Sequence, residues 1–268
     1  MTTDLGIQNT IETRSGPVDG SRIEEADVYQ TIPATATRVR VSEQLLADYQ
    51  DVFTPEALQA LDALEPLDRE RKLLMQERIA RRLDRFRRKQ PLGFLDPDSK
   101  IEGTEILVRD AREGKFEGPV IPEDLKRQWI QGTGPAARPR SSVTKSLRNV
   151  AYALLSGADG WMFDGEDALG QVDTMSLDNI RCLKLAVHKD PEFLEVARQV
   201  SEEMNGWSKD FLGREIVPDW KQQLDFTTKI FRARGLHLDD RHLRDAEGHG
   251  FSASITDTVL YVVNNYRR

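Results

Sequence analysis

Apolar residues recur at helical spacing once the polar beginning of the chain is passed. Residues 1–40 show no sustained period, and only 37–41 is a candidate strand. From 42 to 53, apolar side chains stand one, three and four positions apart, which predicts a helix. A second helix is predicted from Pro55 to about Leu64, because Thr54 can cap it and proline suits the first helical position.

The longest predicted helix covers 68–89, where arginine and lysine surround a stripe of apolar side chains. The stripe consists of Leu73, Leu74, Ile79, Leu83 and Phe86. We interpret this segment as a solvated helix whose apolar stripe lies over its own domain, with the basic side chains extended along the surface. Phosphate binding by the basic face is the alternative. The segment 91–97 (PLGFLDP) ends the helix.

Short apolar runs and helical stripes alternate through the rest of the chain. Strands are predicted at 104–108, 161–163 and 229–232, and helices at 142–155, from Ser176, from Pro191 to about Met204, and at 255–266. A connector with a short helix is predicted over 119–129, and 132–140 (GTGPAARPR) is a loop by composition. This order is typical of a parallel sheet or a β/α barrel.

Composition and charge exclude several classes of protein. The 268 residues include 45 acidic and 38 basic side chains, and the net charge of −7 argues against a nucleic-acid or anionic-membrane partner. Apolar runs are too short to span a bilayer and the start lacks a signal-peptide pattern, so we expect a soluble cytoplasmic protein. Cys182 is the single cysteine, which excludes an intrachain disulfide. The four histidines lack zinc-ligand spacing.

The candidate chemistry follows the two later strands. Asp164, Glu166 and Asp167 come directly after the apolar run 161–163, at the strand end where barrel enzymes place their reactive groups. Carboxylates are costly to bury unless they are paired or bind a metal. Alternatively, Asp164 is a turn residue and Asp167 caps the next helix. Arg232 ends the other strand, either as an anion-binding arginine or as a partner in a surface ion pair.

Three segments resemble the malate synthases, particularly the shorter form found in plants and many bacteria. They are PEDLKRQWIQGTGP at 122–135, SGADGWMFDGEDALGQVDTMSLDN at 156–179, and FRARGLH at 231–237 followed by GFSASITDTVLY at 250–261. The helices from Ser42 also look like the N-terminal helical region of that family, so the resemblance covers roughly residues 42–268.

The resemblance implies an α/β fold that contains the first strands of a TIM (β/α)8 barrel, preceded by an N-terminal helical region. We therefore expect a polar arm at 1–40, the helical region at 41–98 and the start of the barrel at 99–268.

The family condenses acetyl-CoA with glyoxylate to give malate, in a Mg²⁺-dependent Claisen reaction. Carried over by motif, Arg232 would stabilise the oxygen that becomes negative. Glu166 and Asp167 would hold the waters of the metal and orient the arginine, and Asp164 would support the strand end.

Two departures shape the expected function. Gly165 stands where the family often has an aromatic residue, and extra residues lie between 135 and 156. The resemblance also stops before the third barrel strand of the family, so the direct Mg²⁺ ligands, the general base and most of the acetyl-CoA site are expected outside this chain. We expect an N-terminal portion or subunit of such an acyltransferase, completed by a missing segment or a second polypeptide. The alternatives are a related acyl-CoA or 2-oxo-acid lyase, and a non-catalytic binding subunit.

Overall fold

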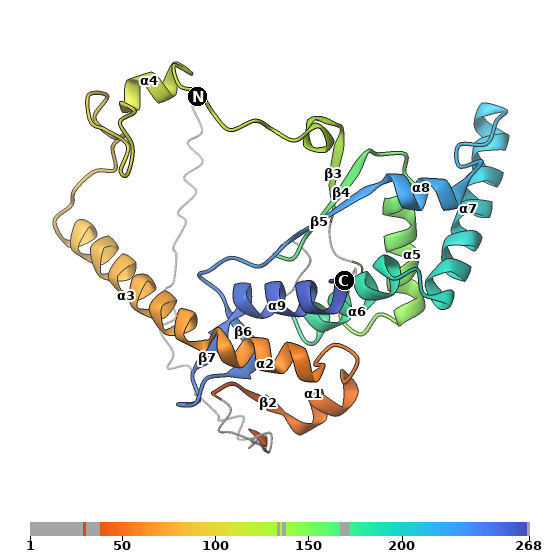
Figure 1. The fold of residues 1–268 in the computed structure, drawn as a ribbon, viewed down its shortest axis with the longest axis horizontal. Helices are drawn as coiled ribbons and strands as arrows, with labels where there is room; N and C mark the ends of the chain where they lie inside the picture. Colours follow the sequence, from red (N-terminus) through yellow and green to blue (C-terminus); the bar gives the residue numbers. More distant parts are fainter. Residues whose placement is uncertain (1–28, 31–37, 133–134, 136–137, 167–171, 267–268) are drawn as a thin grey trace, which may run out of the picture.

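The computed structural model describes residues 29–30, 38–132, 135, 138–166 and 172–266. These residues form a mixed α/β structure with two small sheets and helices packed around them (Figure 1). The α/β class predicted from the sequence is confirmed at this level. Within the described residues the parallel strands form an open sheet rather than a closed barrel.

The parallel sheet carries the candidate chemistry. It consists of β3 (Trp129–Gly132), β4 (Gly160–Asp164) and β5 (Thr228–Arg232), in that order. Gly132 is paired with Phe163, and Asp164 with Arg232, so the carboxyl ends of all three strands share one edge. Strands β4 and β5 were predicted, whereas β3 was missed because its short apolar part lies inside a segment of connector-like composition.

Four helices connect the parallel strands. α5 (Val143–Leu154) joins β3 to β4, whereas α6 (Met175–Val187), α7 (Pro191–Leu212) and α8 (Trp220–Phe226) join β4 to β5. Helix α5 begins at the predicted cap, where Ser142 Oγ accepts a hydrogen bond from the Lys145 amide. Helix α6 begins one residue before the predicted cap, and α7 continues beyond Met204 to a left-handed Gly213. Helix α8 was not predicted.

An antiparallel sheet lies beside these elements, in the order β1–β2–β6–β7. Its strands are β1 (Tyr29–Gln30), β2 (Arg40–Ser42), β6 (Asp239–Arg244) and β7 (Gly250–Ser252). Strand β2 overlaps the candidate at 37–41. Strands β6 and β7 were not predicted, because β6 is mostly charged and contributes only one large apolar side chain, Leu243, to the core.

The N-terminal helices pack on the C-terminal helix. The N-terminal helices are α1 (Glu43–Asp48) and α2 (Pro55–Ala63). Together with α6 and α9 (Ala253–Asn265) they enclose one core, in which α2 and α6 each contact α9. Thr54 caps α2 through a hydrogen bond from the Ala57 amide, and Pro55 is its first residue, as predicted. The shared core includes Val41, Phe53, Leu61, Ile180, Phe251 and Leu260.

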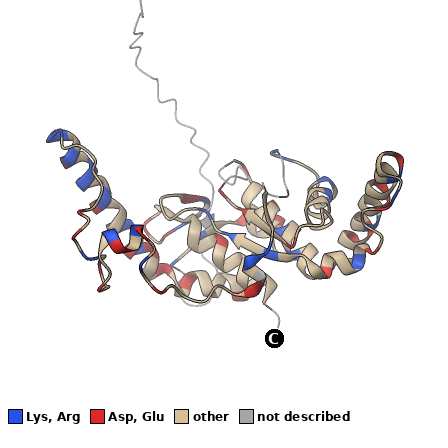
Figure 2. Ribbon diagram, turned by 90° about the horizontal axis from the view of Figure 1, so that it is seen from above, with Lys and Arg blue, Asp and Glu red and all other residues tan. Residues whose placement is uncertain are grey.

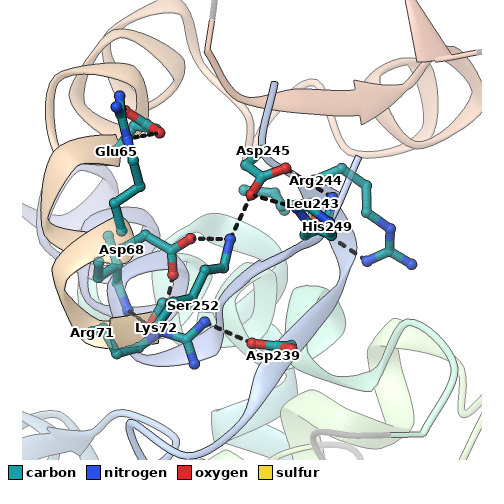
Figure 3. A network of polar contacts seen from close by, with 12 residues as sticks. Glu65, Asp68, Arg71, Lys72, Asp239, Leu243, Arg244, Asp245, His249 and Ser252 are labelled. Atoms are coloured by element: carbon teal, nitrogen blue, oxygen red, sulfur yellow. Dashed lines mark hydrogen bonds and ion pairs between the residues drawn. The ribbon is translucent and has the colours of Figure 1, made fainter. Parts of the chain in front are cut away.

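Helix α3 (Glu65–Arg87) departs from the expectation. Its N-terminal turns are anchored by a buried polar network around Asp68, Arg71 and Lys72 (Figure 3). The rest of the helix extends away from the body (Figure 1), and all five apolar side chains of its stripe are exposed. The interpretation that this stripe lies over its own domain is therefore wrong, because the side chains that α3 buries are its charged ones.

The segment after α3 is a long connector. It contains α4 (Val108–Arg112) and the short helix η1 (Glu123–Lys126), and the latter confirms the helix predicted within 119–129. The strand predicted at 104–108 is wrong, because Leu107 makes only an isolated bridge to Lys100 and Val108 begins α4. Within the described ranges, no helix has the length and hydropathy needed to cross a membrane.

Candidate active site at the carboxyl edge of the parallel sheet

A buried carboxylate and a half-exposed arginine meet where β4 and β5 end. Asp164 is 2% exposed, and its Oδ1 lies 2.5 Å from Arg232 Nη1. The Arg232 side chain remains 49% exposed, so its guanidinium can still contact a ligand. The pairing follows from the register, because these two residues are opposite one another at the ends of adjacent parallel strands.

The Asp164 carboxylate is held from further directions. Gln131 Nε2 of β3 donates to Asp164 Oδ2 at 2.7 Å, and the Glu166 amide donates to Asp164 Oδ1 at 3.1 Å. A buried carboxylate is stabilised only when such donors replace its lost water. Gln131 of β3 thus helps to fix the Asp164 carboxylate of β4, and this carboxylate orients Arg232 of β5.

Glu166 lies on the turn that follows β4 and faces the same edge. Its Oε2 accepts a hydrogen bond from the Gly235 amide at 3.2 Å and lies 3.8 Å from Arg232 Nη2. Its Oε1 lies 3.7 Å from His237 Nε2. The Glu166 side chain is 32% exposed, so its carboxylate is anchored by the protein and still open to water or a ligand.

Gly165 allows the turn between the two acids to approach β5. Its amide donates to the Arg232 carbonyl oxygen at 2.9 Å, which continues the strand pairing by one residue. A Cβ atom at this position would lie 3.0 Å from the same carbonyl oxygen and 3.6 Å from Asp257 Oδ2. An aromatic residue here would require the backbone of Arg232 to shift, which explains glycine as part of this particular geometry.

A second arginine, Arg234, forms a fully buried network behind the edge. It donates from Nε to Asp257 Oδ2 at 2.8 Å and from Nη2 to Asp257 Oδ1 at 2.7 Å, and Nη2 also lies 2.5 Å from Asp240 Oδ2. The Arg234 amide donates to Asp257 Oδ2 at 3.0 Å as well. Side chain and backbone of Arg234 are thus fixed to α9, which positions the next residue, Gly235, against Glu166.

Burial dominates the electrostatics of this network. It raises the pKa of the Asp257 carboxyl above its ordinary value, although the hydrogen bonds and charge of Arg234 act in the opposite direction. For Arg234, burial lowers the pKa, but Asp257 and Asp240 outweigh it and leave the pKa raised, so the guanidinium stays charged. The triad of Arg234, Asp240 and Asp257 was not predicted from the sequence. The available signal was a second arginine, Arg234, two positions after Arg232 in FRARGLH.

Of the three catalytic candidates named from the sequence, two come together. Arg232 and Glu166 face one another at the carboxyl edge, and Asp164, the proposed support of the strand end, pairs with Arg232. Asp167 lies outside the described residues. The catalytic roles of all three stay predictions. Across the described ranges, no three His, Cys, Asp or Glu side chains are grouped so that they could hold a metal ion.

Two cavities lie beside the strands that form this edge. One of about 380 Å³ is lined by Lys229 at the start of β5, with Leu154, Lys189 and Asp225. A cavity beside Gly165 and Asp257 measures about 10 Å³, too small for a substrate.

The chain is similar in sequence to malate synthases. It is 28% identical over 235 residues to one from Myxococcus xanthus (strain DK1622) and 26% identical over 236 residues to one from Streptomyces clavuligerus. Each alignment covers 88% of this chain and 36% of the relative, so the chain spans about a third of the length of the curated relatives it matches. No family model matches the chain. The malate synthase-like relationship suggested by the motifs is confirmed, at a distant level.

Proposed function

We propose that this chain supplies part of the active site of a malate synthase-like acyltransferase, which condenses acetyl-CoA with glyoxylate to give malate. The observation that carries the proposal is the arrangement of Arg232, Asp164 and Glu166 at the carboxyl edge of three parallel strands. The sequence similarity to proteins named malate synthase supports the same reaction class.

Arg232 is proposed to stabilise negative charge on the reacting oxygen. In a Claisen condensation, the carbon of the acetyl enolate attacks the glyoxylate carbonyl, whose oxygen becomes an alkoxide. A guanidinium that is always charged and already oriented can donate to this oxygen without reorganising. Asp164 provides that orientation through Nη1, while the exposed half of the Arg232 side chain faces the reactants.

Glu166 is proposed to connect the arginine with the metal site. Mg²⁺ would supply Lewis-acid polarisation of the glyoxylate carbonyl. The described acids already accept hydrogen bonds from Arg232, Gln131 and Gly235, which suits them to bind waters of the ion rather than the ion itself. Glu166, with Asp167 by its place in the motif, is the residue we assign to this role; the direct ligands are proposed to lie outside this chain.

The remaining strands are proposed to complete a TIM (β/α)8 barrel. In the described sheet, β3 and β5 each pair with β4 on one side, so their outer edges are available to further strands. A (β/α)8 barrel needs eight parallel strands, and the three parallel strands of the described residues would be its first ones. A second polypeptide or a further segment would supply the others, together with the general base and most of the acetyl-CoA site.

Purification of the tagged chain from its native host, followed by assay of the intact assembly, tests this proposal. With acetyl-CoA, glyoxylate and Mg²⁺, we expect stoichiometric malate and free CoA, and loss of both products after chelation of the metal. Release of glyoxylate or a 2-oxo acid from an acyl substrate, without use of acetyl-CoA, would indicate the lyase alternative. An assembly that performs neither reaction would contradict the proposal and favour a binding subunit.

A further inference from the structure

Two long helices project from the body and leave apolar side chains uncovered. Helix α3 has 23 residues and α7 has 22, and each is anchored at its N-terminal end. They extend from opposite ends of the molecule toward the same side, as Figure 2 shows. The distance between them means that one cannot cover the other within a single chain (Figure 1).

The distal half of α3 presents an apolar seam. Ile79, Leu83 and Phe86 are spaced four and three residues apart, the spacing of one helix face, and are 52%, 48% and 81% exposed. Together with Arg82 they line a shallow hollow of about 250 Å³. Exposed apolar patches of this kind on a helix usually mark a site of protein–protein contact.

Positive charge surrounds this seam. Residues 78–89 contain seven basic side chains and one acid, and Figure 2 shows basic residues gathered toward the tip of α3. Helix α3 as a whole has eight basic and five acidic residues, a net charge of +3. A partner for this surface should therefore combine an apolar seam with acidic residues.

The C-terminal turns of α7 have these properties. Trp207 and Phe211 are 57% and 73% exposed, and their ring centroids lie 5.3 Å apart, so the two rings form one aromatic surface. Leu212, the last residue of the helix, is exposed as well. Glu203 and Asp210 are exposed along the same turns, and Glu203 already pairs with Arg148 of α5 at 2.6 Å. Helix α7 has five acidic and two basic residues, a net charge of −3, equal and opposite to that of α3.

We propose that two copies of this chain associate through reciprocal contacts, in which the distal half of α3 in each copy packs on the C-terminal turns of α7 in the other. Each copy carries one surface of each kind. A twofold axis can form both contacts at once. The axis must be perpendicular to the line that joins the two helices and also to the direction in which the helices extend. Rotation about it places α3 of each copy against α7 of the other. Stable protein–protein interfaces bury about 1,200–2,000 Å² in total. Two helix–helix contacts reach this area more readily than one, which favours the reciprocal arrangement. This association does not depend on the proposed reaction.

Sedimentation velocity of the full-length chain, over about 1–100 µM, tests the proposal. We expect a dimer at low ionic strength that dissociates more readily at high salt, because salt screens the charge complementarity. Phe86→Glu on α3 and Trp207→Glu on α7 should each weaken the dimer about tenfold or more, the effect expected when a buried aromatic contact is replaced by a charge. Val120→Glu, at a 90% exposed site in the connector, is the matched control and should leave the dimer unchanged.

A mixture of the two variants identifies which helices meet. A heterodimer of a Phe86→Glu chain and a Trp207→Glu chain contains one contact in which both surfaces are intact. We therefore expect the mixture to associate more tightly than either variant alone. Because both side chains are exposed in the single chain, circular dichroism and Tm of each variant should match those of the wild type at a concentration low enough for all three to be monomeric.

Three results would overturn the proposal. One is a wild-type chain that is monomeric over the whole range. Another is a dimer that survives both substitutions, which would place the contact elsewhere, such as at the edges of the parallel sheet. The third is a dimer that is weakened by Phe86→Glu but not by Trp207→Glu, which would indicate that α3 pairs with α3.

Discussion

Two arginines that are only two positions apart have opposite surroundings. Arg232 is 49% exposed and pairs with one buried acid, whereas Arg234 is 1% exposed and is enclosed by Asp257 and Asp240. The first remains accessible to solvent, and the second holds the chain between β5 and β6 against α9. The difference determines which arginine is a candidate for chemistry and which one supports the site.

Removing one charge from the buried network should destabilise the fold strongly. In Asp257→Asn, Arg234 loses an ionised partner that accepts from both its guanidinium and its amide, and a buried charge without full compensation is costly. We expect the free energy of unfolding to fall by about 3 kcal/mol. Urea denaturation monitored by circular dichroism measures this loss, because a shift of the midpoint at an unchanged m value reports a change in the free energy of unfolding.

An exposed ion-pair cluster provides the control for that change. Arg198 on α7 lies 2.7 Å from Glu195 and 2.5 Å from Glu202, but it is 42% exposed. Arg198→Gln should cost less than about 1 kcal/mol, because solvent screens such pairs. Equal losses in the two variants would contradict the distinction drawn between buried and exposed pairs.

At the residue scale, the sequence predicted the residues at the strand ends but not the side chains that support them. Asp164, Glu166 and Arg232 were singled out because they stand at or just after the ends of two apolar strands, and their roles came from the family resemblance. Gln131 was missed together with its strand β3, and Arg234, Asp240 and Asp257 come from three elements whose proximity no local spacing reveals. Burial of charged residues depends on tertiary neighbours, which a pattern along the chain does not encode.

At the element scale, helix α3 is attached to the body by charged rather than apolar side chains. Lys72 Nζ lies 2.6 Å from Asp245 Oδ2 and 2.7 Å from Asp68 Oδ2. Arg71 joins Asp68 to Asp239, and Figure 3 shows how these side chains connect α3 with β6 and the residues after it. The attachment is therefore sensitive to pH, whereas an apolar contact would not be.

The pKa values of this pair set the direction of that dependence. Burial raises the pKa of Asp245, but the hydrogen bonds from Lys72 and the His249 amide, together with nearby positive charge, outweigh it and leave the pKa below its ordinary value. Burial lowers the pKa of Lys72, and its bonds to Asp245 and Asp68 outweigh that and leave the pKa raised. The stability that Asp245 contributes is fully present above the pKa that Asp245 has in the unfolded chain, and it is lost as pH falls through the lower pKa of the folded chain. The stability that Lys72 contributes is fully present below the pKa that Lys72 has in the unfolded chain, and it is lost as pH rises through the higher pKa of the folded chain.

Lys72→Met should lower stability mainly at intermediate pH. We expect a loss of about 2 kcal/mol between about pH 5 and 9, since a hydrogen-bonded ion pair is removed while Asp68 keeps Arg71. The difference from the wild type should begin to shrink below about pH 4 and above about pH 10.5, where the two groups titrate in the unfolded chain. It should disappear only beyond the shifted pKa values of Asp245 and Lys72 in the folded chain, which lie further out in each direction. Urea denaturation across the pH range measures this difference, and a loss independent of pH would contradict the electrostatic account.

Elements with strong local signals were predictable, and elements defined by their neighbours were not. Helices α2 and α5 were located by their caps and their apolar stripes. Strands β6 and β7 were missed because their stability comes from pairing with β2 and with each other, not from an apolar run. The stripe of α3 was expected to lie over its own domain because periodicity shows which side chains share a face, but not what lies opposite that face.

At the scale of the whole molecule, the two ends of the described chain share one core. Leu61 of α2 is fully buried in the cluster that also contains Phe251 and Leu260. Asn264 Nδ2 donates to the Val52 carbonyl oxygen at 2.9 Å, and Tyr49 Oη donates to Asp178 at 2.6 Å. The N-terminal helices should therefore fold together with the C-terminal half of the chain.

Leu61→Ala should destabilise the whole molecule rather than one helix. A buried leucine replaced by alanine costs about 2–5 kcal/mol, and the shared core predicts a single transition. Fluorescence of the four tryptophans, which all follow residue 128, and circular dichroism should shift together. Leu74→Ala on the exposed face of α3 should change stability by less than about 0.5 kcal/mol. Loss of helix signal without a shift in tryptophan fluorescence would contradict the shared core.

The central claim, that the Arg232 guanidinium acts on the reactants, is tested most directly by one comparison of rates. The measurement is malate formation by the assembly purified from the native host, with either wild-type chain or Arg232→Lys. A lysine keeps the charge but loses the planar, two-directional donor set that reaches Asp164 and a ligand together.

We predict a rate at least about 100-fold lower for Arg232→Lys, with Tm within about 2 °C of the wild type because the side chain is half exposed. Arg109→Lys, at a surface arginine that is 52% exposed and paired with Asp98, should leave the rate unchanged. A wild-type rate in the Arg232→Lys assembly would contradict the account, since no other residue assigned here stabilises the developing negative charge.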